Sequence, residues 1–308
     1  MKKTYRWDNL TSRELGALAE NNAIVLIPTG STEQHGPHLP VGTDAILATW
    51  FAERTAQGLQ EKGVPAVVAP TFAIANSMHH MTFPGSLSLR PRTYMECLQE
   101  QCRAIASHGF KRMAIINGHG GNIAPTKAAL VDINIELGFP VYFLEYMVVD
   151  EAPFLETQKG MIHACESETS LMLAYDESLV DPIYKETSGY GGGCTVHEDE
   201  GVLHTFPRLE SHTVNGVMGN SYAATKEKGE KLAGEYGCGK VYTDMDAFLA
   251  DPEKLKTSKK GRRCMHKDFP ASELIIVAGM AIEDGKKLED WKRYVFPHPT
   301  AGEIFREF

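Results

Sequence analysis

Short apolar runs alternate with longer amphipathic segments along the first half of the chain. The apolar runs lie at 23–27, 66–70, 113–116 and 141–144, and each is short enough for a strand that is buried on both faces. Apolar residues recur at helical spacing over 44–63, 91–109 and 125–138, with glycine or proline at the boundaries. Strands alternating with helices predict βαβ units and a parallel sheet covered by helices on both faces, an α/β fold.

The second half of the chain is less regular. It contains expected helices at 171–175 and 222–236, a Gly- and His-rich loop at 188–215, a basic tract at 254–267, an expected strand at 273–278 and a C-terminal arm at 291–308. A further short helix is expected near the N-terminus, with Ser12 as its N-cap. We expect one domain over 1–250 that includes the loop at 188–215, and a C-terminal extension over 251–308 packed on that domain.

Composition narrows the possible classes of function. Of the 308 residues, 43% are apolar, and the net charge of -9 argues against nucleic acid or an anionic membrane as a partner. No apolar run approaches the roughly 18 residues of a membrane span, and no apolar stretch follows the N-terminal lysines, so no signal peptide is expected. The six cysteines show no C-x-x-C spacing, which favours reduced thiols in the cytoplasm.

The loop after the first apolar run carries candidate metal ligands. Glu33 and His35 fall on the same side of the chain if this stretch is extended, because side chains alternate with a period of two. Asp44 follows after two prolines that stiffen the link. Two carboxylates and an imidazole suit Zn²⁺ or Mn²⁺. In the alternative interpretation these are solvated loop residues, with Asp44 as the N-cap of the next helix.

Further candidate ligands follow the second and third apolar runs and precede the helix at 171–175. They are His79, His80, His119, His163 and Glu168. Because the carboxyl ends of parallel strands share one edge of a sheet, we expect the loops to converge there. The Gly-rich turn at 117–122 could instead cradle phosphate, but it lacks the spacing and the lysine of known phosphate-binding loops.

Four motifs together resemble the creatininase family, metal-dependent amidohydrolases that also include formamide hydrolases and peptide-processing members. The motifs are G-S-T-E-Q-H-G-P-H-L-P-V-G-T-D (30–44), S-x-x-H-x-x-F-P-G (77–85), N-G-H-G-G-N (117–122) and H-A-x-x-x-E-T-S (163–170). The resemblance covers most of residues 20–236. It implies a three-layer αβα domain with a mostly parallel sheet, two divalent ions per chain (Zn²⁺ or Mn²⁺), and a homo-oligomer, a hexamer in the family.

The resemblance also implies roles for individual residues. Asp44 would bridge the two ions, and Glu33, His35 and His119 would be terminal ligands. Creatinine-hydrolysing members place a glutamate where this chain has Gly121, so Glu168 is expected to supply the missing ligand. Its neighbour Glu166 is expected to face solvent. Creatininase also closes over its substrate with a tryptophan before the histidine of the fourth motif, and this chain has none there. Creatinine is therefore not the expected substrate.

The remaining roles concern catalysis and substrate. The expected catalytic residues are Glu168 and His163, which would give a proton to the leaving group or orient Glu168. Substrate contacts are expected from Ser77, His80 and Gly120, with His80 holding either a ligand or the substrate carbonyl. The polar loop at 188–215 is expected to fold over the metals as a lid. Alternatively, it is a disordered excursion or an oligomer contact without a role in the chemistry.

Three functions fit these features. The first is hydrolysis of the C–N bond of a small cyclic or short amide by water that two metal ions activate. The alternative is ring opening of a cyclic polyol ketone of the inosose type, which cleaves a C–C bond with the same ligands. A non-catalytic metal- or sugar-binding protein is the third, and the complete ligand set argues against it.

Overall fold

The computed structural model describes residues 5–145, 151–189, 209 and 213–234. The basic tract at 254–267, the expected strand at 273–278, the arm at 291–308 and most of the loop at 188–215 lie outside the described residues. The division into a domain over 1–250 and a C-terminal extension therefore stays a prediction.

Four parallel strands form the sheet, at the places that the apolar runs predicted. They are β1 (Ile24–Thr29), β2 (Ala66–Val68), β3 (Arg112–Asn117) and β4 (Val141–Glu145), in the order β2-β1-β3-β4. Ile24 pairs with Ala66 on one side and with Arg112 on the other. All six residues of β1 are buried, because the strand lies inside the sheet and helices cover both of its faces.

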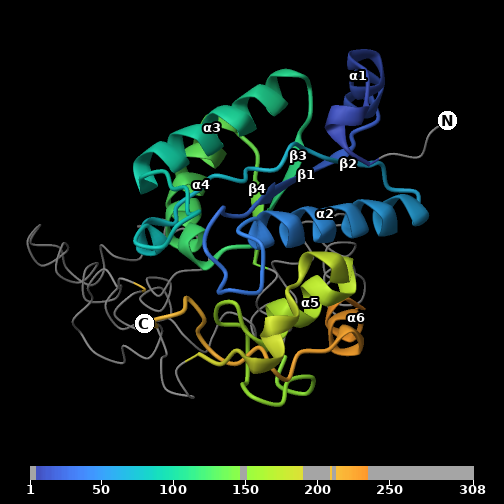
Figure 1. Ribbon diagram of the computed structural model, residues 1–308. Coiled ribbons are helices and arrows are strands. Elements are labelled where there is room, and N and C mark those ends of the chain that lie inside the picture. Colours follow the sequence, from blue (N-terminus) through green and yellow to red (C-terminus); the bar gives the residue numbers. More distant parts are fainter. Residues whose placement is uncertain (1–4, 146–150, 190–208, 210–212, 235–308) are drawn as a thin grey trace, which may run out of the picture. The chain divides into compact units, whose positions relative to one another are not determined.

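Helices cover both faces of the sheet. Figure 1 shows α3 (Pro91–Ser107) and α4 (Ile123–Leu137) on one face and α2 (Thr43–Glu61) on the other. Beyond α2 lie α5 (Glu166–Asp176) and α6 (Lys226–Gly234), which pack against each other, while α1 (Ser12–Glu20) precedes the sheet. The predicted three-layer αβα architecture is confirmed. The core of the α3–α4 face is formed by Val25, Ile27, Tyr94, Leu98, Ile115 and Ile133.

Several helix boundaries differ from the expected ones. The N-cap of α1 is Thr11, not Ser12, because Thr11 and Glu14 form a reciprocal capping box. The N-cap of α2 is Gly42, so the interpretation of Asp44 as a cap is wrong, and Asp44 lies in the first turn of the helix. Helix α5 begins at Glu166, well before the apolar segment at 171–175 that predicted it.

The order of the strands determines where a site can form. From β1 the chain crosses first to β2 on one side and later to β3 on the other, so the carboxyl ends of β1 and β3 flank a topological switch point. Ligand sites of open α/β sheets lie at such points. The loops that follow β1, β2 and β3 carry Glu33, His80 and His119, and all three side chains are buried.

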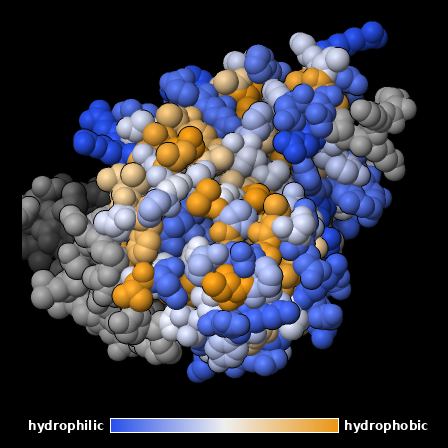
Figure 2. All heavy atoms as spheres, viewed as in Figure 1, coloured by the Kyte–Doolittle hydropathy of each residue, from blue (hydrophilic) through white to orange (hydrophobic). Residues whose placement is uncertain are grey.

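The surface gives little further guidance to function. Figure 2 shows hydrophobic side chains in several small groups separated by hydrophilic ones, as is common on protein surfaces. Among the described residues, no helix combines the length and the apolar character needed to cross a membrane.

Candidate metal centre

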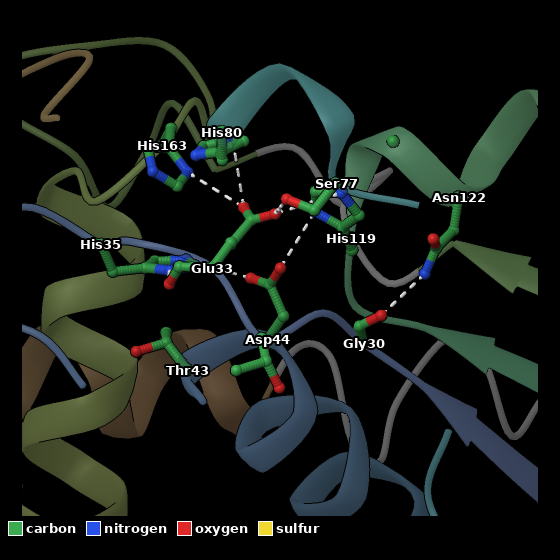
Figure 3. Close-up of polar contacts among 12 residues, drawn as sticks. Gly30, Glu33, His35, Thr43, Asp44, Ser77, His80, His119, Asn122 and His163 are labelled. Carbon is green, nitrogen blue, oxygen red and sulfur yellow. Dashed lines mark hydrogen bonds and ion pairs between the residues drawn. The ribbon is translucent and has the colours of Figure 1, made fainter. Parts of the chain in front are cut away.

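The carboxylate of Glu33 lies among polar side chains that are buried at the carboxyl edge of the sheet. Its Oε2 accepts a hydrogen bond from Ser77 Oγ and lies 3.3 Å from His119 Nε2. Its Oε1 lies 3.4 Å from His80 Nε2 and 3.6 Å from His163 Nδ1. Figure 3 shows these side chains gathered around the carboxylate. The loops after β1, β2 and β3 and the segment before α5 therefore converge, as the sequence predicted.

The carboxylate of Asp44 lies between two histidines. Its Oδ1 is 3.0 Å from His35 Nε2, and its Oδ2 is 2.9 Å from His119 Nδ1. Glu168 Oε1 faces the same nitrogen of the first histidine, at 3.9 Å from His35 Nε2. Each oxygen of Asp44 thus faces a different group of ligands, an arrangement that suits a carboxylate bridging two ions.

Close backbone packing sets these carboxylates in place. A Cβ atom at Gly30 would collide with the backbone of Asp44 and Ala45, so only glycine lets the end of β1 approach the start of α2 this closely. The side chain of Asn122 donates to Gly30 O at 2.9 Å (Figure 3) and accepts from Asn76 N at 3.1 Å. These contacts join the loops after β1, β2 and β3.

Charges in this cluster partly compensate one another. Burial raises the pKa of Glu33 to about 7. Burial opposes a charged His119, yet the carboxylates of Glu33 and Asp44 raise the pKa of His119 to about 9. Burial likewise opposes charge on His35 and Asp44, but their mutual attraction raises the pKa of His35 and lowers that of Asp44. In the metal-free protein, protonated His35 and His119 thus balance the negative charge of the carboxylates. Bound divalent ions would supply that positive charge instead of the protons.

The residues present fit divalent metal ions. Three groups of side chains have ligand atoms within 4.8 Å of one another: Glu33, His35 and His163; Glu33, His79 and His119; and His35, Asp44 and Glu168. His35 Nε2 and Asp44 Oδ2 are buried and lie close to Asp44 Oδ1 and His119 Nδ1, yet neither atom takes part in a hydrogen bond within the described part of the chain. Imidazole nitrogens and carboxylate oxygens are the donors that Zn²⁺ and Mn²⁺ prefer. The structure thus brings all five predicted metal ligands, Glu33, His35, Asp44, His119 and Glu168, into one cluster.

A strained turn orients Glu168. Its Oε2 accepts a hydrogen bond from the backbone N–H of Ala164, which leaves Oε1 directed to His35. Ala164 has a φ of 50°, a left-handed conformation that costs an alanine about 1–2 kcal/mol. Strain of this kind persists where the surrounding structure fixes it, often at functional sites.

The expectation that Glu166 faces solvent is wrong. This side chain is fully buried at the start of α5, where it accepts hydrogen bonds from the backbone of Glu156 and Thr157. Lys228 Nζ of α6 lies 2.6 Å from its Oε1. Although burial opposes a charged carboxylate, Lys228 and these hydrogen bonds lower the pKa of Glu166. Glu166 therefore joins α5 to α6 and to the preceding loop.

The predicted substrate contacts have different surroundings. Ser77 is fully buried, and its hydroxyl is engaged with Glu33. His80 is also buried and touches Glu33, whereas Gly120, which follows His119, is exposed. Cys165 takes no part, because burial raises the pKa of its thiol to about 12. The substrate roles of Ser77, His80 and Gly120 stay predictions.

Sequence reasoning missed two buried polar residues of the first motif. Gln34 contacts His80 and His163, and His38 Nε2 lies 2.9 Å from Thr169 Oγ1 next to Glu168. No spacing rule marks a glutamine as part of a site, since its amide has no characteristic chemistry. The only signal was its position between Glu33 and His35.

Replacing Gly121 tests why this position carries no carboxylate. A Cβ at Gly121 would collide with Asn76 O and the ring of His119, so Gly121→Ala is expected to destabilise the protein by about 1–3 kcal/mol. Gly160→Ala is the matched control, because nothing lies within 4 Å of a Cβ there. Thermal melting compares the two variants. A Gly121→Ala variant as stable as wild type would mean that a Cβ atom fits here and that packing does not explain the glycine.

Known proteins resemble both the sequence and the fold. The family model described as Creatininase, creatinine amidohydrolase, matches residues 8–236. The mycofactocin precursor peptide peptidase of Mycolicibacterium smegmatis is 32% identical over 241 residues, which are 74% of this chain and 86% of that protein. The creatinine amidohydrolase of Pseudomonas putida is 28% identical over 257 residues, 75% of this chain and 93% of that protein.

Solved structures agree with these matches. A crystal structure of creatinine amidohydrolase (creatininase) aligns with a TM-score of 0.64 at 25% identity, covering 81% of this chain and 98% of that chain. The matched residues include β1 to β4 and the candidate ligands Glu33, Asp44, His119 and Glu168. The chain therefore belongs to the creatininase family.

Proposed function

We propose that this chain is a dinuclear metal hydrolase that cleaves the amide bond of a short or cyclic amide. One observation carries the proposal. The two oxygens of Asp44 face different histidines: Oδ1 faces His35, whose Nε2 also faces Glu168, and Oδ2 faces His119 Nδ1. The other ring nitrogen of His119 faces Glu33. Such a set would give each of two ions a place, with the carboxylate of Asp44 shared by both.

The residues of the site would have three roles: holding the metal ions, transferring a proton and orienting a ligand. His35, Glu168 and Asp44 would hold one ion, and His119 and Asp44 would hold the other, with Glu33 as a further ligand in the cluster. When bound, two such ions polarise a carbonyl group and lower the pKa of water between them. His163 would move a proton between attacking water and leaving amine, and its Nδ1, 3.6 Å from Glu33 Oε1, supports this role. The hydroxyl of Ser77 donates a hydrogen bond to the carboxylate of Glu33, and metal ligands are commonly oriented by such partners.

The substrate we propose is a peptide or another short amide, rather than creatinine. The peptidase of Mycolicibacterium smegmatis is more similar in sequence to this chain than is the creatinine amidohydrolase of Pseudomonas putida. Gly121 leaves no room for the glutamate of creatinine-hydrolysing members. The 3-dehydro-scyllo-inosose hydrolase of Thermotoga maritima is 26% identical over only 54% of this chain, so ring opening of an inosose remains the second candidate.

The donor atoms and one structural neighbour support two candidate metals. A solved structure named Creatininase Mn aligns with a TM-score of 0.64 at 25% identity. Mixed imidazole and carboxylate donors suit both Mn²⁺ and Zn²⁺. We therefore propose Mn²⁺ or Zn²⁺, two ions per chain, in a cytoplasmic homo-oligomer whose subunit number light scattering after gel filtration would establish.

Activity assays on protein loaded with Zn²⁺ or Mn²⁺ test the proposal. Three groups of compounds are compared: short peptides, cyclic amides that include creatinine, and inososes. We expect peptides or other amides to be hydrolysed, exhaustive chelation to abolish turnover, and added Zn²⁺ or Mn²⁺ to restore it. Full activity after chelation would contradict a metal mechanism. Turnover of inososes alone would favour the second candidate.

A further inference from the structure

The side chain of Gln34 lies between two histidines of the site. Its Nε2 is 3.0 Å from His80 Nδ1, 2.9 Å from His163 Nε2 and 3.0 Å from Gly216 O. The residue is buried, and the two imidazole rings lie 4.4 Å apart between centroids. One amide nitrogen therefore contacts both rings that flank Glu33.

Backbone groups fix which way the amide of Gln34 points. Its Oε1 lies 3.0 Å from the backbone N–H of Gly36, which requires an acceptor. Its Nε2 faces the carbonyl of Gly216, which requires a donor. A rotated amide would place oxygen against oxygen and N–H against N–H. A Cβ at Gly216 would collide with Gln34, and Gly216 has a φ of 81° that favours glycine, so the backbone is shaped around this side chain.

Counting protons then determines the state of both rings. The amide nitrogen has two protons, and Gly216 O takes one of them. Among the residues that the structure describes, the only partner of His80 Nδ1 is the amide nitrogen of Gln34, which is a donor. His80 Nδ1 must therefore be unprotonated and accept the second amide proton. The ring proton of His80 is then on Nε2, which faces Glu33.

No amide proton then remains for His163. Its Nε2 also lies 2.9 Å from Gln34 O, a backbone acceptor, so this nitrogen is satisfied when it carries the ring proton and donates to that carbonyl. The lone pair of His163 Nδ1 then faces Glu33 Oε1 and the metal ligands. This distribution gives a complementary partner to both amide protons of Gln34, to His80 Nδ1 and to His163 Nε2, and the approach of Gln34 Nε2 to His163 Nε2 is then a contact without a hydrogen bond.

We infer that Gln34 is a positioning residue that fixes the ring proton of His80 on Nε2 and, through it, that of His163 on Nε2. His163 then presents a lone pair to the site and enters the reaction as a proton acceptor. It becomes the donor to the leaving group only after it has taken up a proton. The consequence for catalysis rests on the proposed function, but the tautomers can be measured without turnover.

Nitrogen NMR of the full chain, labelled with ¹⁵N-histidine and loaded with diamagnetic Zn²⁺, tests the inference. Long-range proton–nitrogen spectra distinguish the two neutral tautomers, and His80→Asn and His163→Asn variants assign the two rings. We expect both rings to carry their proton on Nε2. A wild-type His80 ring protonated on Nδ1 would overturn the inference, whatever the enzyme hydrolyses.

Gln34→Glu adds a second measurement. A carboxylate can still accept from Gly36 but cannot donate to His80 Nδ1, so the proton of His80 is expected to move to Nδ1 while that of His163 stays on Nε2. Gln60→Glu is the matched control, since Gln60 also donates to a carbonyl, Ala66 O at 2.9 Å, away from both rings. It should change neither tautomer. An unchanged His80 tautomer in a folded Gln34→Glu protein would contradict the positioning role.

Discussion

Asp44→Asn is expected to remove both metal ions and to lower kcat/KM for the amide substrate by about 10³-fold or more. Each carboxylate oxygen of Asp44 faces a different ligand group, so the loss of its charge weakens both places at once. Metal ions contribute several kcal/mol to stabilising a developing charge, and a loss of about 4 kcal/mol corresponds to roughly 10³-fold in rate. The replacement is nearly isosteric, so packing in the first turn of α2 should be kept.

Elemental analysis after gentle purification provides the main measurement. Wild type is expected to hold close to two equivalents of Zn or Mn, and Asp44→Asn far less than one. Asp132→Asn serves as a control, because Asp132 lies on the exposed face of α4 away from the ligands. An Asp44→Asn protein that keeps two equivalents would exclude the bridging role. Loss of one ion alone would make Asp44 a terminal ligand.

The sequence predicted the architecture well, because the periodicity of apolar residues follows from local geometry. All four strands and the helices between them lie where the patterns placed them, with ends that differ by a few residues. Convergence of Glu33, His80 and His119 followed from topology alone, since parallel strands present their carboxyl ends at one edge. The grouping of Glu168 with His35 and Asp44 did not follow from topology, and it was expected only from the family resemblance.

What the sequence could not predict depends on contacts between distant residues. Glu166 and Glu168 lie two positions apart in one motif and have the same side chain. Glu166 has a structural role because it pairs with Lys228, which is 62 residues further along the chain. Gln34 acquires its role from Gly216, which is 182 residues away. No local pattern encodes such pairs. The N-cap of α1 was missed for a simpler reason, because adjacent threonine and serine are both good caps and only the partner glutamate decides between them.

Glu168→Gln and Glu166→Gln are expected to have opposite effects, although the two residues lie two positions apart in one helix. Glu168→Gln should lose the ion that His35 shares and lower kcat/KM by about 10³-fold, or roughly 4 kcal/mol. Its amide oxygen can still accept from Ala164, so melting of the metal-free protein should be close to wild type. The comparison is made without metal because bound ions raise the apparent stability.

Glu166→Gln should instead keep its metal and lose stability. The replacement leaves Lys228 with the exposed carboxylate of Glu156 as its remaining counter-charge, and removing the buried partner of such a pair costs about 3 kcal/mol. That loss lowers Tm by roughly 6–12 °C. Lys228→Met in the Glu166→Gln background tests the cause, since an apolar side chain no longer needs the carboxylate and part of the loss should be recovered. If Glu166→Gln lost metal while Glu168→Gln lost only stability, the assigned roles would be wrong: Glu166 would be the metal ligand and Glu168 the structural carboxylate.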